Sequence, residues 1–118
     1  MILIKKFEFD AAHHLTKYHG KCERPHGHTY TLVVKLEGTP DDEDMIFDFV
    51  MLKDIVKKNV LDHFDHHDLN DILENPSAEN IAIDIWSRLV DLVKRPNCKL
   101  YEIEVWETKS SGVVYRGE

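Results

Sequence analysis

The stretch from Ile2 to His13, ILIKKFEFDAAH, alternates between two kinds of side chain along most of its length. One set of alternate positions is apolar and ends in a histidine: Leu3, Phe7, Phe9, Ala11 and His13. The other set is mainly charged, with Lys5 as an exception to the alternation: Ile4, Lys6, Glu8 and Asp10. Because successive side chains of a β-strand point to opposite faces, this period of two predicts a strand with one buried face.

The same period returns after a polar loop over residues 15–25. Over residues 29–36, four apolar side chains share one face: Tyr30, Leu32, Val34 and Leu36. Gly38-Thr39-Pro40 and the acidic run 41–44 then predict a solvent-exposed turn. The chain therefore begins with two strands.

Two helices and two further strands follow. Asp48 is a candidate N-cap for a helix that runs to about residue 62, with apolar positions at Phe49, Leu52, Val56 and Val60. Ser77 is the candidate cap of a second helix that ends at Lys94-Arg95, with apolar positions at Ile81, Ile85, Leu89 and Leu92. Residues 99–107 alternate again, with Tyr101, Ile103 and Val105 on one face and Glu102 and Glu104 on the other, and residues 113–116 form a short last strand. The order β-β-α-α-β-β predicts an α+β fold, with an antiparallel sheet that carries two helices on one face.

Composition bounds the class of protein. The chain has 118 residues, enough for one domain over residues 1–118, and a net charge of −7. This charge argues against a general binder of nucleic acid or anionic membranes, because both are negatively charged and bind to basic protein surfaces. No apolar run approaches the roughly 18 residues of a membrane span, and the N-terminal stretch does not resemble a secretory signal. Two cysteines form no disulfide framework, so we expect a reducing, cytoplasmic setting.

Histidine is unusually frequent, with eight in the chain. His26 and His28 are two apart at the entry to the second strand and so point to one face, while His13 ends the first strand on its apolar face. Three imidazoles with an open fourth position are typical of a catalytic zinc site. The alternative is that these are ordinary half-buried histidines at strand ends.

Cys22 lies four residues before His26, in a charged loop that favours the thiolate. It is either a fourth zinc ligand, which would make the site structural, or a general base or nucleophile beside an open site. Its spacing leaves both interpretations open. Cys98 has no such neighbours and is interpreted as structural or incidental.

Two acidic residues, Asp65 and Glu107, are further candidates for the functional site. Asp65 beside His66 could orient that imidazole for proton transfer, although a solvated loop, or a second metal on His63 and His67, are alternatives. Glu107 continues the parity of Ile103 and Val105, so a carboxylate is predicted on an apolar strand face. Such a carboxylate needs a partner, which is either the N–H pair of a planar ligand or an arginine, Arg88 or Arg116. The alternative is that the strand has ended by residue 107, in which case the parity carries no meaning.

Taken in order, these motifs resemble one family. They are Ala11-Ala12-His13, Cys22-Glu23-Arg24-Pro25-His26-Gly27-His28, Asp65-His66-His67-Asp68-Leu69-Asn70, Asn75-Pro76-Ser77-Ala78-Glu79-Asn80, Trp106-Glu107-Thr108 and Tyr115-Arg116-Gly117-Glu118. The family contains 6-pyruvoyltetrahydropterin synthase and 6-carboxytetrahydropterin synthase of the queuosine (7-deazaguanine) pathway. The resemblance covers essentially the whole chain.

The resemblance implies a tunnelling fold (T-fold) that assembles as a homo-oligomer, a hexamer of two trimers, with active sites between subunits. It implies Zn²⁺ on His13, His26 and His28, and a catalytic group of Cys22 as base with Asp65 and His66 as proton relay. Glu107 would anchor a pterin ring. The further candidates for binding the substrate are Ser77, Thr108, Arg24 and Arg116, and Lys17, Lys21 and Lys109 are additional candidates for its triphosphate.

The spacing Cys-x-x-x-His-Gly-His resembles the carboxy-forming branch of the family. The implied reaction converts 7,8-dihydroneopterin triphosphate to 6-carboxytetrahydropterin, acetaldehyde and triphosphate. The alternatives are a 6-pyruvoyltetrahydropterin synthase, which eliminates triphosphate without cleaving a carbon–carbon bond, and a non-catalytic zinc-binding oligomer that Cys22 would close.

Overall fold

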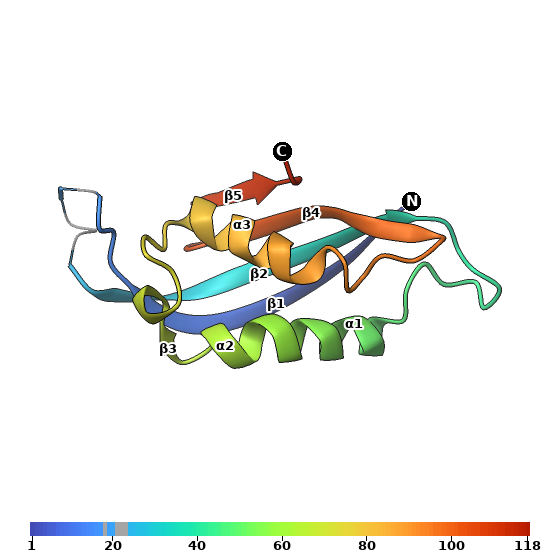
Figure 1. Cartoon of the computed structure of the whole chain (residues 1–118), viewed down its shortest axis with the longest axis horizontal. Helices are drawn as coiled ribbons and strands as arrows, with labels where there is room; N and C mark the ends of the chain where they lie inside the picture. Colours follow the sequence, from blue (N-terminus) through green and yellow to red (C-terminus); the bar gives the residue numbers. More distant parts are fainter. Residues whose placement is uncertain (18, 21–23) are drawn as a thin grey trace.

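A computed structural model describes residues 1–17, 19–20 and 24–118 (Figure 1). The described part contains a five-stranded sheet in the order β3-β1-β2-β4-β5. The strands are β1 (Ile2–His13), β2 (His26–Gly38), β3 (His67–Asp68), β4 (Cys98–Trp106) and β5 (Gly112–Tyr115). The helices are α1 (Phe49–Val56), which continues through a π-helical turn (Lys57–Leu61) into α2 (Asp62–Phe64), a 3₁₀ turn (Leu69–Asp71), and α3 (Ala78–Leu89).

The long antiparallel pair β1–β2 confirms the period-two interpretation of the first stretch. Its register runs without a shift from Ile2 opposite Glu37 to His13 opposite His26. Phe9 and Tyr30 lie opposite one another on the same face, and their rings stack with centroids 4.9 Å apart. This register brings two of the predicted metal ligands together at one end of the sheet.

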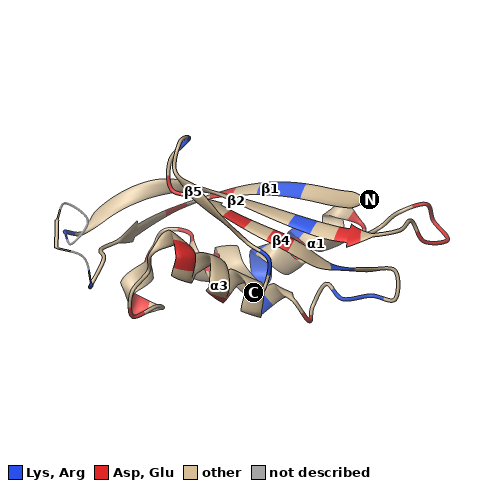
Figure 2. Cartoon of the chain, turned by 90° about the horizontal axis from the view of Figure 1, so that it is seen from above, with Lys and Arg blue, Asp and Glu red and all other residues tan. Residues whose placement is uncertain are grey.

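Both helices cover one face of the sheet, as the α+β pattern predicts, and the 90° view in Figure 2 shows them on the same side. Leu52 and Val56 of α1 and Ile81, Ile85 and Leu89 of α3 are fully buried against that face. Each such side chain contributes about 1.5–3 kcal/mol by leaving water. Asp48 and Ser77 cap the two helices as predicted, since their side chains accept hydrogen bonds from the N–H groups of Val50 and Asn80.

Several element boundaries differ from the sequence prediction, and one short strand was not predicted. The second helix ends at Leu89 rather than at Lys94-Arg95, and the chain then turns so that Val93 is buried and Leu92 is exposed. β2 begins at His26 rather than residue 29. The short strand β3 was not predicted, because two residues that pair in parallel with Ala11 and Ala12 leave no periodic signal.

A β-bulge changes the parity of β4. Lys35 lies opposite Glu102, whereas the next residue of β2, Leu36, lies opposite Leu100, so Tyr101 is the extra residue. Tyr101 is therefore not on the core face with Ile103, as the alternation had predicted. Glu102 lies on the opposite, helix-free face and is only 3% exposed there.

Salt bridges satisfy the carboxylates on this helix-free face. The Lys35 ammonium lies 2.6 Å from both the Glu102 and the Glu104 carboxylates, and Arg116 also binds Glu102. Burial raises the pKa of Glu104, but hydrogen bonds from Lys35 and Trp106 outweigh it and hold that pKa at about 2. Figure 2 shows acidic and basic residues together on the strands. None of the helices in the described ranges is long and apolar enough to cross a membrane.

Candidate metal and pterin site

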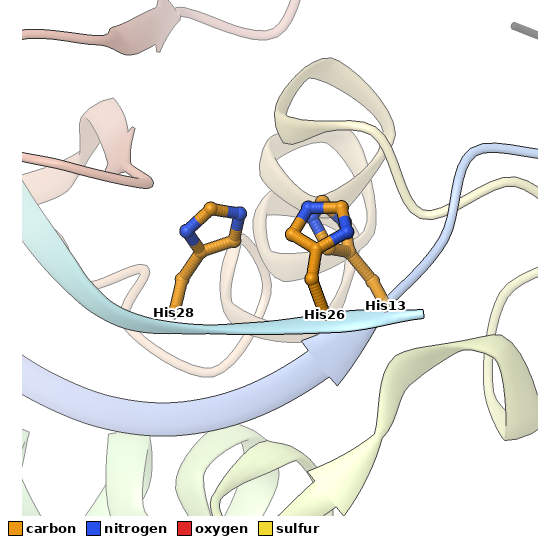
Figure 3. A group of neighbouring side chains, drawn as sticks. All are labelled: His13, His26 and His28. Atoms are coloured by element: carbon orange, nitrogen blue, oxygen red, sulfur yellow. The ribbon is translucent and has the colours of Figure 1, made fainter. Parts of the chain in front are cut away.

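Three histidines meet where β1 ends and β2 begins. The ligand nitrogens of His13, His26 and His28 all lie within 4.8 Å of one another. The rings stand on the same side of the two strands (Figure 3), with centroids 4.5 to 5.0 Å apart. The strand parity and the β1–β2 register together explain this meeting, because His13 and His26 are cross-strand partners and His28 follows two residues later on the same face.

Backbone carbonyls orient two of these rings. The Nδ1–H of His13 donates to the Pro76 carbonyl at 2.7 Å, and the Nδ1–H of His26 donates to the Arg24 carbonyl at the same distance. Each bond leaves Nε2 as the nitrogen with a free lone pair. The Nε2 atoms of His13 and His28 are buried and have no hydrogen-bond partner among the described residues. Buried lone pairs that converge without a donor fit a cation, and three imidazoles suit a divalent metal such as zinc.

The Glu107 carboxylate lies beside this cluster. Its Oε1 lies 3.9 Å from His13 Nε2 and its Oε2 lies 4.0 Å from His28 Nε2, with 26% of the side chain exposed. The β2–β4 register explains its position: Thr31 lies opposite Trp106, so one further step brings Glu107 opposite Tyr30 on the core face. β4 itself ends at Trp106, and the contacts with His13 and His28 are what place Glu107 on the predicted face.

Glu107 has no arginine partner in the described structure. Arg88 binds Asp84 at 2.7 Å, and Arg116 binds Glu102 on the other face of the sheet. The interpretation that an arginine neutralises Glu107 is therefore wrong. The carboxylate remains available to accept hydrogen bonds from a ligand beside the three histidines.

Electrostatics favour the neutral form of one of these imidazoles, His28. Burial lowers the pKa of His28, the Glu107 charge opposes this shift, and His13 and His26 reinforce it. Neutral imidazole is the form that binds a metal. The lowered pKa of His28 therefore favours the form of this side chain that can act as a ligand.

Tyr30 lies beneath the cluster and was not singled out by the sequence. Its ring centroid is 5.5 Å from that of His28 and 5.9 Å from that of His13, and the side chain is fully buried. Burial raises its pKa, and the Glu107 charge raises it further. The alternation His26, His28, Tyr30 could have identified this residue. The role of the Pro76 carbonyl could not have been identified, because every residue has a backbone carbonyl and the sequence does not show which one contacts His13.

Asp65 and His66 form a second polar cluster. Asp65 Oδ1 accepts the backbone N–H of Asp10 at 2.9 Å and lies 3.1 Å from His66 Nδ1. The Asp10 N–H, opposed by burial and assisted by His66, holds the pKa of Asp65 below its usual value. His66 has a φ of 60°, an unfavourable backbone conformation for a non-glycine residue, and donates its N–H to the Asp10 carbonyl. The backbone of Asp10 thus holds both partners.

This pair does not meet the three histidines within one chain. The carboxylate of Asp10, which accepts from Thr29 at 2.6 Å, groups with Asp65 and His66 within 4.8 Å. Asp10 and Thr29 alternate with His13 and His28, so they lie on the opposite face of the sheet. An open pocket of about 580 Å³ lies beside the pair and is lined by Asp10, Ala11, Ala12, Gly27, His28, Thr29, His66, His67 and Asp68.

The other predicted substrate-binding residues are scattered. Ser77 caps α3 directly after Pro76 and so lies near His13, while Thr108 is exposed in the turn after Glu107. Arg24 is exposed next to His26. Arg116 is held elsewhere, against Glu102 and with its guanidinium 5.1 Å from the Tyr101 ring centroid, so one chain does not bring it to the histidine cluster.

Three further predictions concern Cys22, Cys98 and a second metal site. Cys22 lies outside the described residues. Cys98 is buried, with its sulfur 3.7 Å from the Val93 carbonyl, as expected for a structural residue. The second metal on His63 and His67 is wrong, because the helix ends at Phe64 and Asp65 is extended, so these histidines do not share a helix face.

Comparisons with known proteins agree with this geometry. The family model of 6-pyruvoyl tetrahydropterin synthase matches residues 2–118. The chain is 36% identical to 6-pyruvoyl tetrahydrobiopterin synthase of Dictyostelium discoideum, covering 100% of this chain and 97% of that protein. It is 38% identical to 6-carboxy-5,6,7,8-tetrahydropterin synthase of Synechocystis, covering 97% and 92%.

The fold has a close match among solved structures. The structure of Caenorhabditis elegans 6-pyruvoyl tetrahydropterin synthase superposes with a TM-score of 0.88 at 30% identity, covering 100% of this chain and 96% of that one. The match supports the T-fold that the sequence motifs implied. The match of the family model over residues 2–118, together with the identity to these two relatives, shows that this chain belongs to the 6-pyruvoyl tetrahydropterin synthase family.

Proposed function

We propose that the chain is a single-domain, zinc-dependent carbon–carbon lyase. It would convert 7,8-dihydroneopterin triphosphate to 6-carboxytetrahydropterin, acetaldehyde and triphosphate in queuosine (7-deazaguanine) biosynthesis. The observation that carries this proposal is the group of His13, His26 and His28 with Glu107 within 4.0 Å of two of them. The spacing from Cys22 to His26 and the similarity to a 6-carboxy-forming relative favour this product.

His13, His26 and His28 would hold the zinc ion through Nε2, which the carbonyl bonds to Nδ1 leave free on two of them. Zinc, when bound, would supply Lewis-acid stabilisation of negative charge on the side-chain oxygens of the substrate. Glu107 would accept hydrogen bonds from a ring N–H and the amino group of the pterin. Two parallel bonds fix the plane of the ring, and orientation of this kind accelerates a reaction.

Cys22, Asp65 and His66 would carry out the proton transfers. The Cys22 thiolate would remove a carbon-bound proton that the adjacent pterin ring makes acidic. His66 would return a proton, with Asp65 holding the imidazole through its Nδ1 side. The lowered pKa of Asp65 supports this role, since an ionised carboxylate accepts a hydrogen bond from the imidazole and so orients it.

The triphosphate would need local positive charge on a chain of net charge −7. Arg24, next to His26, and Lys109, two residues after Glu107, are the exposed cations nearest in sequence to the site. Arg116 of the same chain is less suited because Glu102 already neutralises it. A substrate held by Ser77 and Thr108 as well would span the space between the α3 N-terminus and the β4–β5 turn.

The two polar clusters support a homo-oligomer with shared sites, proposed as a hexamer built from trimers. The three histidines and the Asp65–His66 pair lie on opposite faces of one sheet, and a side chain cannot reach through the sheet. One reaction that uses both clusters therefore needs the histidines of one copy and the Asp65–His66 pair of another.

Mixing two inactive variants tests this shared site. His66→Ala retains the three histidines, and His28→Ala retains the Asp65–His66 pair. If a site combines two copies, co-refolded equal mixtures should regain about one quarter of the unchanged activity, from random pairing of subunits. Each variant refolded alone is the control. If the mixture stays as inactive as the separate variants, each site belongs to one chain and the shared-site proposal is wrong.

Product analysis tests the reaction itself. Zinc-loaded protein incubated with 7,8-dihydroneopterin triphosphate should release acetaldehyde and triphosphate and form 6-carboxytetrahydropterin, followed by mass spectrometry. The similarity to a 6-pyruvoyl-forming relative favours the alternative product, 6-pyruvoyltetrahydropterin, which forms without acetaldehyde. The absence of acetaldehyde and carboxypterin contradicts the proposed lyase, and pyruvoyl product alone assigns the alternative.

A further inference from the structure

Tyr30 carries a buried hydroxyl that the fold does not satisfy. Its side chain is fully buried, and Oη has no hydrogen-bond partner among the described residues. The ring has a structural explanation, since it stacks on Phe9 at 4.9 Å with an interplanar angle of 10°. The hydroxyl has none, and a phenylalanine would fill the same stack without burying an unpaired polar group.

The surroundings of this hydroxyl are those of the candidate site. The rings of His13 and His28 lie edge-on to the Tyr30 ring, and the Glu107 carboxylate lies within 4.0 Å of the Nε2 atoms of the same two histidines. The last β2–β4 pair is Thr31 with Trp106, so one further step along both chains would set Glu107 beside Tyr30. Cross-strand neighbours on one face have Cβ atoms about 4.5–5.5 Å apart. Tyr30 and Glu107 therefore project into the same space, beside the unpartnered Nε2 atoms of His13 and His28.

We infer that Tyr30 is a positioning residue, whose hydroxyl donates a hydrogen bond to the Glu107 carboxylate when the site is occupied. This inference rests on the proposed function, in which Glu107 holds the pterin ring. A glutamate side chain rotates about several bonds, whereas the Tyr30 ring is locked by its stack and its burial. A donor from so rigid a side chain would fix the carboxylate in the orientation that accepts two parallel bonds from the ring.

The chemistry of the carboxylate has room for this donor. An ionised carboxylate offers about four acceptor positions, of which a bidentate ligand uses two. The described contacts of Glu107 with His13 and His28, at 3.9 and 4.0 Å, are longer than hydrogen bonds. A phenol O–H is thus a fitting donor for one of the remaining positions.

Tyr30→Phe in the zinc-loaded full chain tests this inference, with 7,8-dihydroneopterin as the probe and its dissociation constant measured by calorimetry. We expect about ten-fold weaker binding, as for loss of a hydrogen bond to a charged group. Zinc content should stay unchanged, and the melting temperature of the metal-free chain should be unchanged or higher, because an unpaired buried hydroxyl has been removed. A purely structural hydroxyl would leave the affinity for the probe at its original value.

Repeating Tyr30→Phe in a Glu107→Gln variant shows whether the hydroxyl acts through the Glu107 carboxylate or affects binding in some other way. There, Tyr30→Phe should change probe affinity less than two-fold, since the charged acceptor is already gone. Equal binding by Tyr30→Phe and the unchanged chain overturns the role of Tyr30, and so does a full ten-fold loss that persists in the Glu107→Gln background. If the unchanged chain does not bind the probe, the proposed pterin function fails, and the role of Tyr30 with it.

Discussion

His28→Ala is expected to abolish both zinc binding and turnover. The substitution removes one of three ligand nitrogens that lie within 4.8 Å of one another. Loss of a residue that only supports a ligand weakens metal binding 10- to 100-fold, so loss of a ligand itself should weaken it by more than about 100-fold. Dialysis against a weak chelator followed by elemental analysis should find zinc in the unchanged protein and none in the variant.

His63→Ala is the matched control for this experiment. His63 is an exposed histidine on α2, away from the three-histidine cluster. It should keep its zinc and its activity, and both variants should retain the circular dichroism of the folded chain. Full zinc occupancy in His28→Ala would contradict the assignment of the three histidines as the metal site.

Cys22→Ala is expected to keep zinc and the fold but to lose turnover about 10²- to 10⁴-fold, the usual contribution of a positioned general base. The physical reason is that alanine cannot accept the carbon-bound proton, while the three imidazoles and Glu107 remain in place. Metal content and the turnover number are measured on the same preparation.

Cys98→Ala provides the same chemical change at a buried position that faces the Val93 carbonyl. Turnover by this control, corrected for the folded fraction, should equal that of the unchanged protein. If Cys22→Ala loses its zinc instead, Cys22 is a closing ligand, and the chain would be the non-catalytic zinc-binding oligomer rather than the lyase.

Local pattern accounts for much of the fold. The period of two along Ile2–His13 and along β2, and the caps Asp48 and Ser77, depend on neighbours in sequence, and the structure confirms them. Where the pattern failed, a long-range contact was responsible. The bulge at Tyr101 reversed the parity of β4 before Glu102, so that Leu100 rather than Tyr101 lies on the core face, and β3 exists only because β1 offers it an edge.

The candidate site likewise has one part that the local pattern predicts and another part that long-range contacts decide. Alternation within each strand was enough to put His13, His26, His28 and Glu107 on core-facing positions, because side-chain direction in a strand is a local property. Which strands lie side by side, and in which register, is a property of hydrogen bonds between distant segments. Those bonds bring Glu107 to within 4.0 Å of His13 and His28, direct the Pro76 carbonyl at His13, and separate the Asp65–His66 pair from the histidine cluster by the thickness of the sheet.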